Sequence, residues 1–411
     1  MLSYASSFGT FCFLDNRGYQ LSPHSHEWIL AAGVKRSINA AAGTALDQLR
    51  QFLASSKGWY FGHLSYDLKN EIESLHSAHA DPIAFQDLFF FEPEILVRYT
   101  AGELIIDGES PEAIFKMIMS QELVATGITS QIDRIQSAFS KEEYLAVVEK
   151  LRAHIHRGDC YEINFCQEFF CRQAKIDPIR VYEALSKESP NPFSACYKLD
   201  SRWLICASPE RYLRKDKDRI LSQPIKGTIK RGGDQASDQS NRMSLEKSEK
   251  DRSENVMVVD LVRNDLSRIC VDGTVKVDEL FGIYEFPQVF QMISTVSGVA
   301  KPGMEIPDMI RASFPMGSMT GAPKKRVMEL IETYEKTKRG IFSGSVGYIN
   351  PEGDFDFNVV IRSIMYNASS GYLSFQAGSA ITYYSEPASE WEECLLKAAA
   401  IAKVLGADSL I

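Results

Sequence analysis

The strand-like segments of this chain come in groups, and long helical segments separate the groups. Four short apolar runs follow one another between residues 161 and 225: YEINFCQEFFC, PFSACYKLD, RWLICASPE and DRILSQPI. Further strands are expected at 281–299, 340–350, 355–366 and 371–383. Consecutive strands without a helix between them pair as antiparallel neighbours, whereas parallel strands need a long crossover. This order therefore predicts an α+β fold with antiparallel sheets, not a doubly wound sheet.

Helices are expected where apolar residues recur with helical spacing. Residues 140–159 begin with Ser140 and Glu143, the spacing of a capping box. Longer helices are expected at about 244–267 and 388–405, and shorter ones at 40–55 and 110–120. We place a boundary before the capping box. It divides the chain into an N-terminal region, 1–138, and a second region, 139–411.

The charge and cysteine content exclude several classes of protein. The 411 residues carry a formal net charge of −9 and no extended basic cluster, which argues against nucleic-acid binding. No apolar run approaches the length of a membrane span, and the N-terminus does not resemble a signal peptide. The eight cysteines form no Cys-x-x-Cys pair, so we expect reduced, mostly buried thiols and a cytoplasmic location.

Two pairs of acidic residues have the spacing of a shared helix face. Glu390 and Glu393 lie three residues apart, and so do Asp251 and Glu254. Each pair has an ordinary explanation, because acidic side chains favour the first turn of a helix or its solvated face. Together the four carboxylates could instead hold a hard divalent cation such as Mg²⁺, which prefers oxygen ligands.

Other polar residues lie where the pattern is otherwise apolar. Glu210 follows a strand and has Arg211 beside it as a possible ion-pair partner, and Arg362 is expected inside the apolar strand FNVVIRSIMY. Arg362 has either an internal salt bridge or a bound anion to pair with. Gly- and Ser-rich segments at 314–326 and 376–381 could bring backbone N–H groups to such an anion. Lys226, between Pro224 and Gly227, is either a solvated loop lysine or a catalytic amine.

Taken in order, nine motifs resemble those of the chorismate-binding enzymes, which include the anthranilate, aminodeoxychorismate, isochorismate and salicylate synthases. The motifs span most of residues 139–411, and GWYFGHLSYD at 58–67 resembles a segment of the family's N-terminal part. They are GDCYEINFCQ, SPNPFSACY, ASPER, PIKGT, ENVMVVDLVRND, FPMGSMTGAPK, FSGSVGY, VIRS, and AGSAI with SEPASEWEE. The resemblance implies two packed antiparallel sheets with helices outside and the active site between them.

The resemblance also implies roles for single residues. Glu254 and Glu393 are expected to bind Mg²⁺ directly, and Asp251 and Glu390 to act as outer partners. The Mg²⁺ would hold the ring carboxylate of chorismate. Further residues expected to contact the substrate are Arg362, Thr320, Gly378, Ser379, Gly227 and Thr228. Glu210 matches the general acid that protonates the departing 4-hydroxyl.

Lys226 decides which branch of the family the chain resembles. Anthranilate synthases typically read Pro-Ile-Ala-Gly-Thr here, whereas aminodeoxychorismate synthases read Pro-Ile-Lys-Gly-Thr, as residues 224–228 do. The implied role of Lys226 is that of a nucleophile that adds to ring C2 before ammonia adds at C4. A lysine of ordinary pKa is almost fully charged near pH 7, so we expect burial or positive charge to lower the pKa of Lys226.

The resemblance leaves alternatives open and has three departures. The expected function is component I of aminodeoxychorismate synthase; the alternatives are anthranilate synthase component I, an isochorismate or salicylate synthase, or a silent chorismate-binding regulator. The chain has no G-x-C-x-G motif, so a separate glutamine amidotransferase subunit is expected to supply ammonia. Glu162 stands where many relatives carry Gln, and Ala380 and Met316 replace usual glycines.

Overall fold

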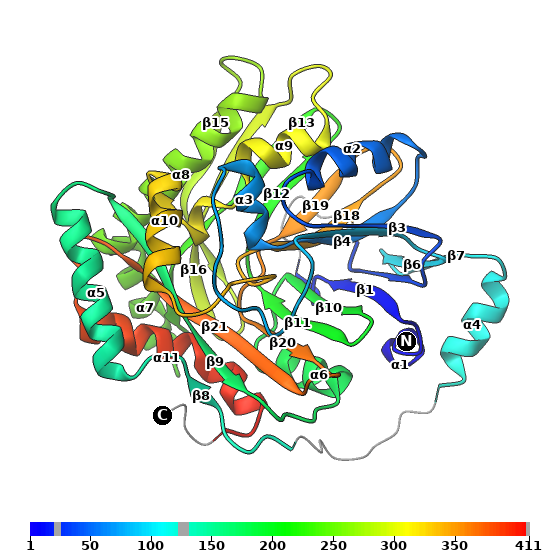
Figure 1. Ribbon diagram of the computed structural model, residues 1–411, viewed down its shortest axis with the longest axis horizontal. Helices are drawn as coiled ribbons and strands as arrows, with labels where there is room; N and C mark the ends of the chain where they lie inside the picture. The colour runs from blue at the N-terminus through cyan, green and yellow to red at the C-terminus, as the bar shows by residue number, and fades with distance from the viewer. Residues whose placement is uncertain (20–25, 122–130, 408–411) are drawn as a thin grey trace.

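The computed structural model describes residues 1–19, 26–121 and 131–407. Within them the strands form two antiparallel sheets that pack against each other, with helices on the outside (Figure 1). The predicted α+β class is therefore confirmed.

The first sheet contains eleven of the described strands. Its strand β8 (Gln136–Ser137) lies off the main path and pairs with β9. The main path runs β17 (Gly321–Ala322), β9 (Glu162–Cys171), β21 (Tyr372–Ile381), β20 (Ser363–Asn367), β11 (Arg202–Ser208), β10 (Phe193–Leu199), β1 (Thr10–Asp15), β2 (Trp28–Ala32), β6 (Ile95–Thr100) and β7 (Glu103–Asp107).

The second sheet contains ten of the described strands. Its strand β15 (Lys276–Glu285) lies off the main path and pairs with β16. The main path runs β14 (Ile225–Lys230), β16 (Val289–Val299), β13 (Arg219–Gln223), β12 (Arg211–Asp216), β19 (Phe355–Asn358), β18 (Ser345–Ile349), β4 (Tyr60–Leu64), β5 (Leu88–Glu92) and β3 (Arg36–Ala40).

The helices are mostly amphipathic segments whose apolar sides face the sheets. Helices α5, α6 and α11 pack along the first sheet, whereas α2, α7 and α8 pack along the second. In chain order the helices are α1 (Leu2–Ala5), α2 (Ala45–Ala54), η1 (Tyr66–Leu68), α3 (Lys69–Ile72), α4 (Pro111–Met119), α5 (Lys141–His156), α6 (Pro178–Glu188), α7 (Gln235–Lys247), α8 (Glu249–Ile269), α9 (Ile306–Ser313), η2 (Gly317–Met319), α10 (Lys324–Tyr334) and α11 (Pro387–Val404).

Local sequence signals set several element ends, and two expectations were wrong. The capping box at Ser140 and Glu143 starts α5 as predicted. The single helix expected at 244–267 is two helices, because Ser248 leaves the helical conformation and its side chain caps α8 by accepting a hydrogen bond from the Asp251 N–H. Arg362 does not lie inside a strand. It occupies the bend before β20 with a φ of 50°, so the chain turns where the apolar pattern continues.

A core of apolar side chains fills the space between the two sheets. Leu204 of β11, Phe90 of β5 and Phe357 of β19 belong to it, together with Val258 of α8. A second core lies between the first sheet and the helices α5, α6, α10 and α11. All eight cysteines are buried and unpaired, as the expectation of reduced thiols requires. Among the described residues, none of the helices combines the length and apolarity that crossing a membrane requires.

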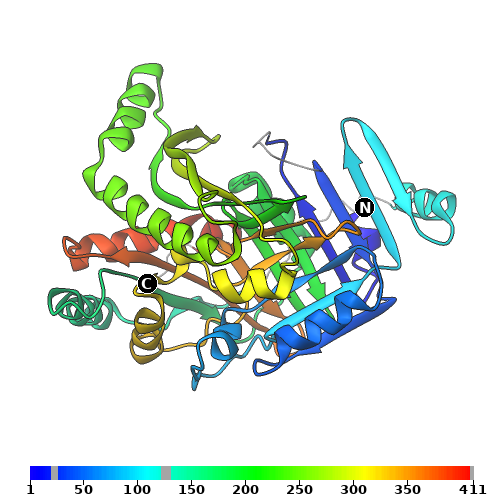
Figure 2. The same ribbon diagram turned by 90° about the horizontal axis from the view of Figure 1, so that it is seen from above.

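Strands from the first 138 residues belong to both sheets. β1, β2, β6, β7 and β8 extend the first sheet, and β3, β4 and β5 extend the second. Figure 2 shows these blue and cyan strands beside green and orange strands from later in the chain. The boundary at 138/139 thus runs through shared sheets, and the division into two regions stays a prediction.

Candidate active site

Lys226 is a buried side chain that links the two sheets. It lies on β14 of the second sheet, and only 8% of its surface is exposed. Its Nζ forms an ion pair and a hydrogen bond with Oε1 of Glu162, the first residue of β9 in the first sheet. Lys226 is therefore not a solvated loop lysine.

The charges around Lys226 act on its protonation in opposite directions. Burial alone would lower the pKa of the Lys226 amine, but Glu162, Glu254 and Glu210 together raise it above its ordinary value. The expected lowering of this pKa is absent, because three carboxylates outweigh the cost of burying one ammonium. In this structure the amine is held in its charged form.

Glu210 lies near both Lys226 and Arg362 and interacts electrostatically with each of them. Glu210 is buried in the connection between β11 and β12, and burial raises its pKa to about 7, against the opposing effects of Ser318, Lys226 and Arg362. Burial lowers the pKa of the Arg362 guanidinium, and Glu210 opposes this. Within the described residues no hydrogen bond or ion pair engages that half-buried guanidinium, so it is available to an anion.

The two predicted acidic pairs come together at the facing ends of α8 and α11. The Nζ of Lys250 lies 3.2 Å from Glu390 Oε1, 3.7 Å from Glu393 Oε2 and 3.9 Å from Glu254 Oε1. Lys250 thus places one positive charge among three of the four predicted ligands. The fourth, Asp251, lies against Gly227, where an added Cβ would approach its side chain to 3.0 Å.

These carboxylates suit a hard cation in chemistry, although they do not form a compact metal site. Among the described residues, no three His, Cys, Asp or Glu side chains are close enough together to hold a metal ion. However, Glu254 Oε1 and Glu390 Oε2 are buried oxygens without a hydrogen-bond partner, and burial raises the pKa of Glu254 to about 7. All the potential donors are carboxylate oxygens, the ligands that Mg²⁺ prefers. The donor set therefore fits Mg²⁺.

The other predicted contact residues lie on β14, β21 and the segment before β17. Thr320 is buried, and its hydroxyl donates to the Met316 carbonyl. Gly378 lies within β21, where its carbonyl accepts a hydrogen bond from Lys397, and Ser379 is buried with an unpartnered hydroxyl. Gly227, with a φ of 87°, adjoins Lys226, whereas Thr228 is exposed to solvent. Gly227 adjoins Lys226 in the chain, and the roles of the other four residues stay predictions.

Glu162, Ser318 and Lys250 were not predicted as site residues. Glu162 was noted only as a departure from the usual Gln, and nothing local shows that β9 meets β14. Ser318 has a buried side chain near Glu210 that opposes the rise in the pKa of that carboxyl. Lys250 could have been found from its spacing, because it lies four residues before Glu254 on α8.

The family follows from a comparison with known sequences. Residues 14–403 match the model of the family described as chorismate binding enzyme. This chain belongs to that family. The match covers nearly the whole described chain and continues across the boundary that we placed at 138/139.

Curated relatives of this chain carry more than one name. The chain is 34% identical to a probable chloroplastic aminodeoxychorismate synthase of Oryza sativa, over 85% of the chain but only 43% of the rice protein. It is 34% identical to aminodeoxychorismate synthase component 1 of Salmonella typhimurium, over 82% of the chain and 74% of that protein. It is also 32% identical to anthranilate synthase component 1 of Thermus thermophilus, over 85% of the chain and 77% of that protein.

The fold is likewise that of a solved anthranilate synthase component I. The structure of anthranilate synthase component I from Streptococcus pneumoniae superposes with a TM-score of 0.82 and 23% sequence identity, covering 93% of both chains. At this identity the similarity concerns the fold alone.

Proposed function

We propose that this enzyme is component I of aminodeoxychorismate synthase, which converts chorismate and ammonia to 4-amino-4-deoxychorismate for p-aminobenzoate and folate synthesis. The observation that carries the proposal is Lys226. It is buried in the candidate site and surrounded by Glu162, Glu210 and Glu254, at the position where the resemblance expects a nucleophile. Relatives named aminodeoxychorismate synthase support it.

In the proposed first step the neutral amine of Lys226 forms a bond to ring C2 of chorismate. The two ring double bonds shift, the C4–O bond breaks, and Glu210 gives its proton to the departing hydroxyl, which leaves as water. A pKa of about 7 suits Glu210 to this task, because a general acid works best when its pKa is near the working pH.

In the second step ammonia forms a bond to C4, the double bonds shift back, and the C2–N bond breaks. Lys226 leaves as the free amine, and the surplus proton on the new C4 amine passes to Glu210. The sum is chorismate plus ammonia giving 4-amino-4-deoxychorismate plus water, and both side chains return to their starting state.

Substrate carboxylates need positive partners in this acidic site. We propose that the half-buried guanidinium of Arg362 binds the enolpyruvyl carboxylate. Glu254 and Glu393 would hold Mg²⁺, with Glu390 and Asp251 as outer partners. When bound there, the ion would attract the ring carboxylate and offset negative charge beside Lys226.

The proposed ammonia source is a separate glutamine amidotransferase subunit in the cytoplasm. The bacterial relative's name, component 1, supports a partner protein. The purified chain should accordingly use ammonium salts but not glutamine. Turnover of glutamine by the chain alone would contradict this part of the proposal.

One experiment separates the proposal from its alternatives. The protein is mixed with chorismate, Mg²⁺ and an ammonium salt, and the products are separated by chromatography. p-Aminobenzoate that forms only after a lyase is added supports aminodeoxychorismate. Fluorescent anthranilate would instead favour the function named for the Thermus thermophilus relative. Tight chorismate binding without turnover would favour a silent regulator.

A further inference from the structure

The backbone around Glu162 is closely packed against β17, which fixes the point from which its side chain starts. β17 crosses closely in front of it. At Gly321, with a φ of 141°, an added Cβ would come within 2.0 Å of the Glu162 carbonyl oxygen. The Tyr161 N–H donates to the Ala322 carbonyl, and the Asn164 N–H donates to the Thr320 carbonyl, at 2.7 and 2.8 Å. Backbone contacts therefore fix both sides of Glu162.

Among the described residues, Lys226 is the only hydrogen-bond partner of the Glu162 side chain. The side chain is almost fully buried, and its Oε2 has no hydrogen-bond partner among the described residues. Its Oε1 accepts from Lys226. A buried carboxylate is costly unless it is paired, so Lys226 is the group that stabilises its charge, and the reverse also holds.

Several other charged groups act on Lys226, but none contacts it in the same way. Glu254 on α8 and Glu210 after β11 act on it through space, Glu393 on α11 is in turn affected by it, and Arg362 lies near Glu210. Among the described residues only Glu162 comes within ion-pair distance of its Nζ.

We propose that Glu162 is a positioning residue for Lys226, which rests on the function proposed above: its carboxylate aims the amine and sets the pH at which the amine becomes nucleophilic. Glutamine at position 162 would keep the size and hydrogen-bonding capacity of the side chain but remove its charge. An opposite charge within hydrogen-bond distance shifts a pKa by about 1–3 units. Removing the charge should therefore increase the neutral fraction of Lys226 by about tenfold or more near neutral pH.

The first test measures the amine directly, without turnover. Cyanate, a small anion that carbamylates neutral amines, is reacted with the full chain at pH 8 and 9 without metal or substrate. Modification of the Lys226 peptide is followed by mass spectrometry. Glu162→Gln should be carbamylated at Lys226 about tenfold faster than the wild type. Glu162→Asp, which keeps the charge, should return the rate towards the wild-type value.

A matched control lies on the same strand. Glu168 is also buried on β9, but its partner is the Tyr372 hydroxyl, 3.2 Å away. Glu168→Gln should leave carbamylation of Lys226 unchanged. Equal rates in the wild type and in a folded Glu162→Gln variant would overturn the inference, and so would an equal increase in Glu168→Gln.

The second test is the pH profile of turnover at constant free ammonia. The pKa of Lys226 lies above that of Glu210, so Lys226 sets the alkaline side of the profile. Glu162→Gln should move that side to lower pH by about one unit or more. The two hypotheses fail separately. If the wild type makes no aminodeoxychorismate, the proposed function fails whatever cyanate shows. If it is active and carbamylation of Lys226 does not respond to Glu162→Gln, only this inference fails.

Discussion

Two buried lysines of this chain, Lys69 and Lys226, both face carboxylates, yet their surroundings act on them in opposite ways. Burial lowers the pKa of Lys69, which Asp67 only partly opposes. Around Lys226 three carboxylates overcome burial and raise the pKa. Burial alone therefore does not make a lysine nucleophilic; the number and distance of the neighbouring charges decide.

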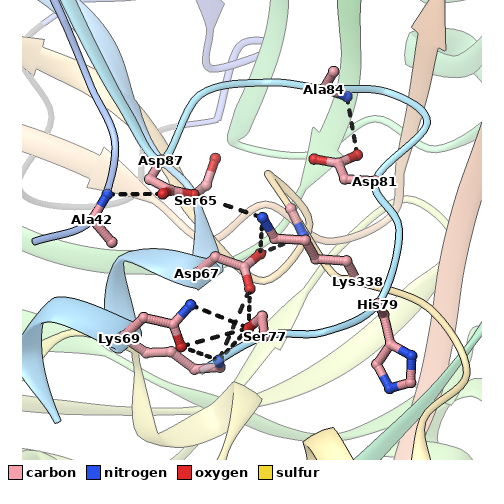
Figure 3. Close-up of polar contacts among 12 residues, drawn as sticks. Ala42, Ser65, Asp67, Lys69, Ser77, His79, Asp81, Ala84, Asp87 and Lys338 are labelled. Carbon is pink, nitrogen blue, oxygen red and sulfur yellow. Dashed lines mark hydrogen bonds and ion pairs between the residues drawn. The ribbon is translucent and has the colours of Figure 1, made fainter. Parts of the chain in front are cut away.

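The two surroundings also differ in how completely they are hydrogen-bonded. Lys69 donates to Asn70 and Ser77, both at 2.8 Å, and Ser77 donates to Asp67 at 2.6 Å (Figure 3). The Gly340 N–H completes the group by donating to Asp67 Oδ2 at 3.0 Å, which ties residues 67–77 to the segment before β18. No side-chain polar atom of Asp67, Lys69 or Ser77 lacks a partner within the described residues.

Around Lys226, several buried carboxylate oxygens accept no hydrogen bond. Glu162, Glu254 and Glu390 each have one buried carboxylate oxygen without a hydrogen-bond partner in the part of the chain that the structure describes. A closed network of buried polar groups rigidifies a fold, whereas unpaired buried oxygens are costly and need an explanation. We interpret the Lys69 cluster as structural and the Lys226 cluster as a site that receives ligands.

The largest expected effect is the loss of turnover when Lys226 is replaced. Lys226→Met should lower turnover of chorismate with ammonium by about a thousandfold or more, because no other group can replace the nucleophile. Lys69→Met should keep the wild-type rate per folded molecule. Initial rates normalised to the folded fraction test both variants. A Lys226→Met variant with more than a tenth of the wild-type rate would contradict the assignment.

The next effect concerns the proton donor. Glu210→Gln should lower kcat by about 10²–10⁴-fold, the usual contribution of general acid catalysis. The step needs Lys226 neutral and Glu210 protonated, and the pKa of Lys226 is the higher of the two. The wild-type rate should therefore rise with pH up to about 7, the pKa of Glu210, and level off above it. In the variant the pH profile of kcat should lose this break and continue to rise above pH 7. An unchanged break would assign it to another group.

A smaller effect, on stability, tests the structural role of the Lys69 cluster. Lys69→Met should lower the free energy of unfolding by about 3 kcal/mol, because it removes one of the two lysines that pair with the buried Asp67. This is the low end of the cost of breaking a buried ion pair, because Lys338 remains 3.9 Å from Asp67 Oδ2. Lys35, an exposed residue, gives the control, and Lys35→Met should change stability by less than about 0.5 kcal/mol. Urea unfolding followed by circular dichroism measures both. Equal stabilities of the two variants would remove the contrast between the clusters.

The smallest effect is the stabilisation expected from Mg²⁺ binding at the Lys226 cluster. Mg²⁺ at one hundred times its dissociation constant should stabilise the wild type by about 2.7 kcal/mol. Thermal unfolding with and without Mg²⁺ should show this gain in the wild type and in Asp67→Asn. The gain should be absent in Glu254→Gln. A gain of equal size in Glu254→Gln would place the metal elsewhere.

Local sequence signals were enough for most elements and for the list of candidate residues. Capping at Ser140, helical spacing and the grouped apolar runs predicted α5, α11 and the antiparallel sheets. The spacing of Asp251 with Glu254, and of Glu390 with Glu393, indicated two acidic helix faces. A break that depends on a single residue was missed: Ser248 separates α7 from α8 inside a segment whose apolar spacing predicted one helix.

By itself, then, the sequence determined the α+β class, the family and the chemical types of the site residues, because these depend on periodicity, spacing and motif order. Only the tertiary structure decided which charges meet. Glu162 and Lys226 lie 64 residues apart and on different sheets, and packing of β9 against β14 brings them into contact. The protonation of Lys226 depends on this ion pair, because the strength of an electrostatic interaction is set by the distance between the charges and by their burial.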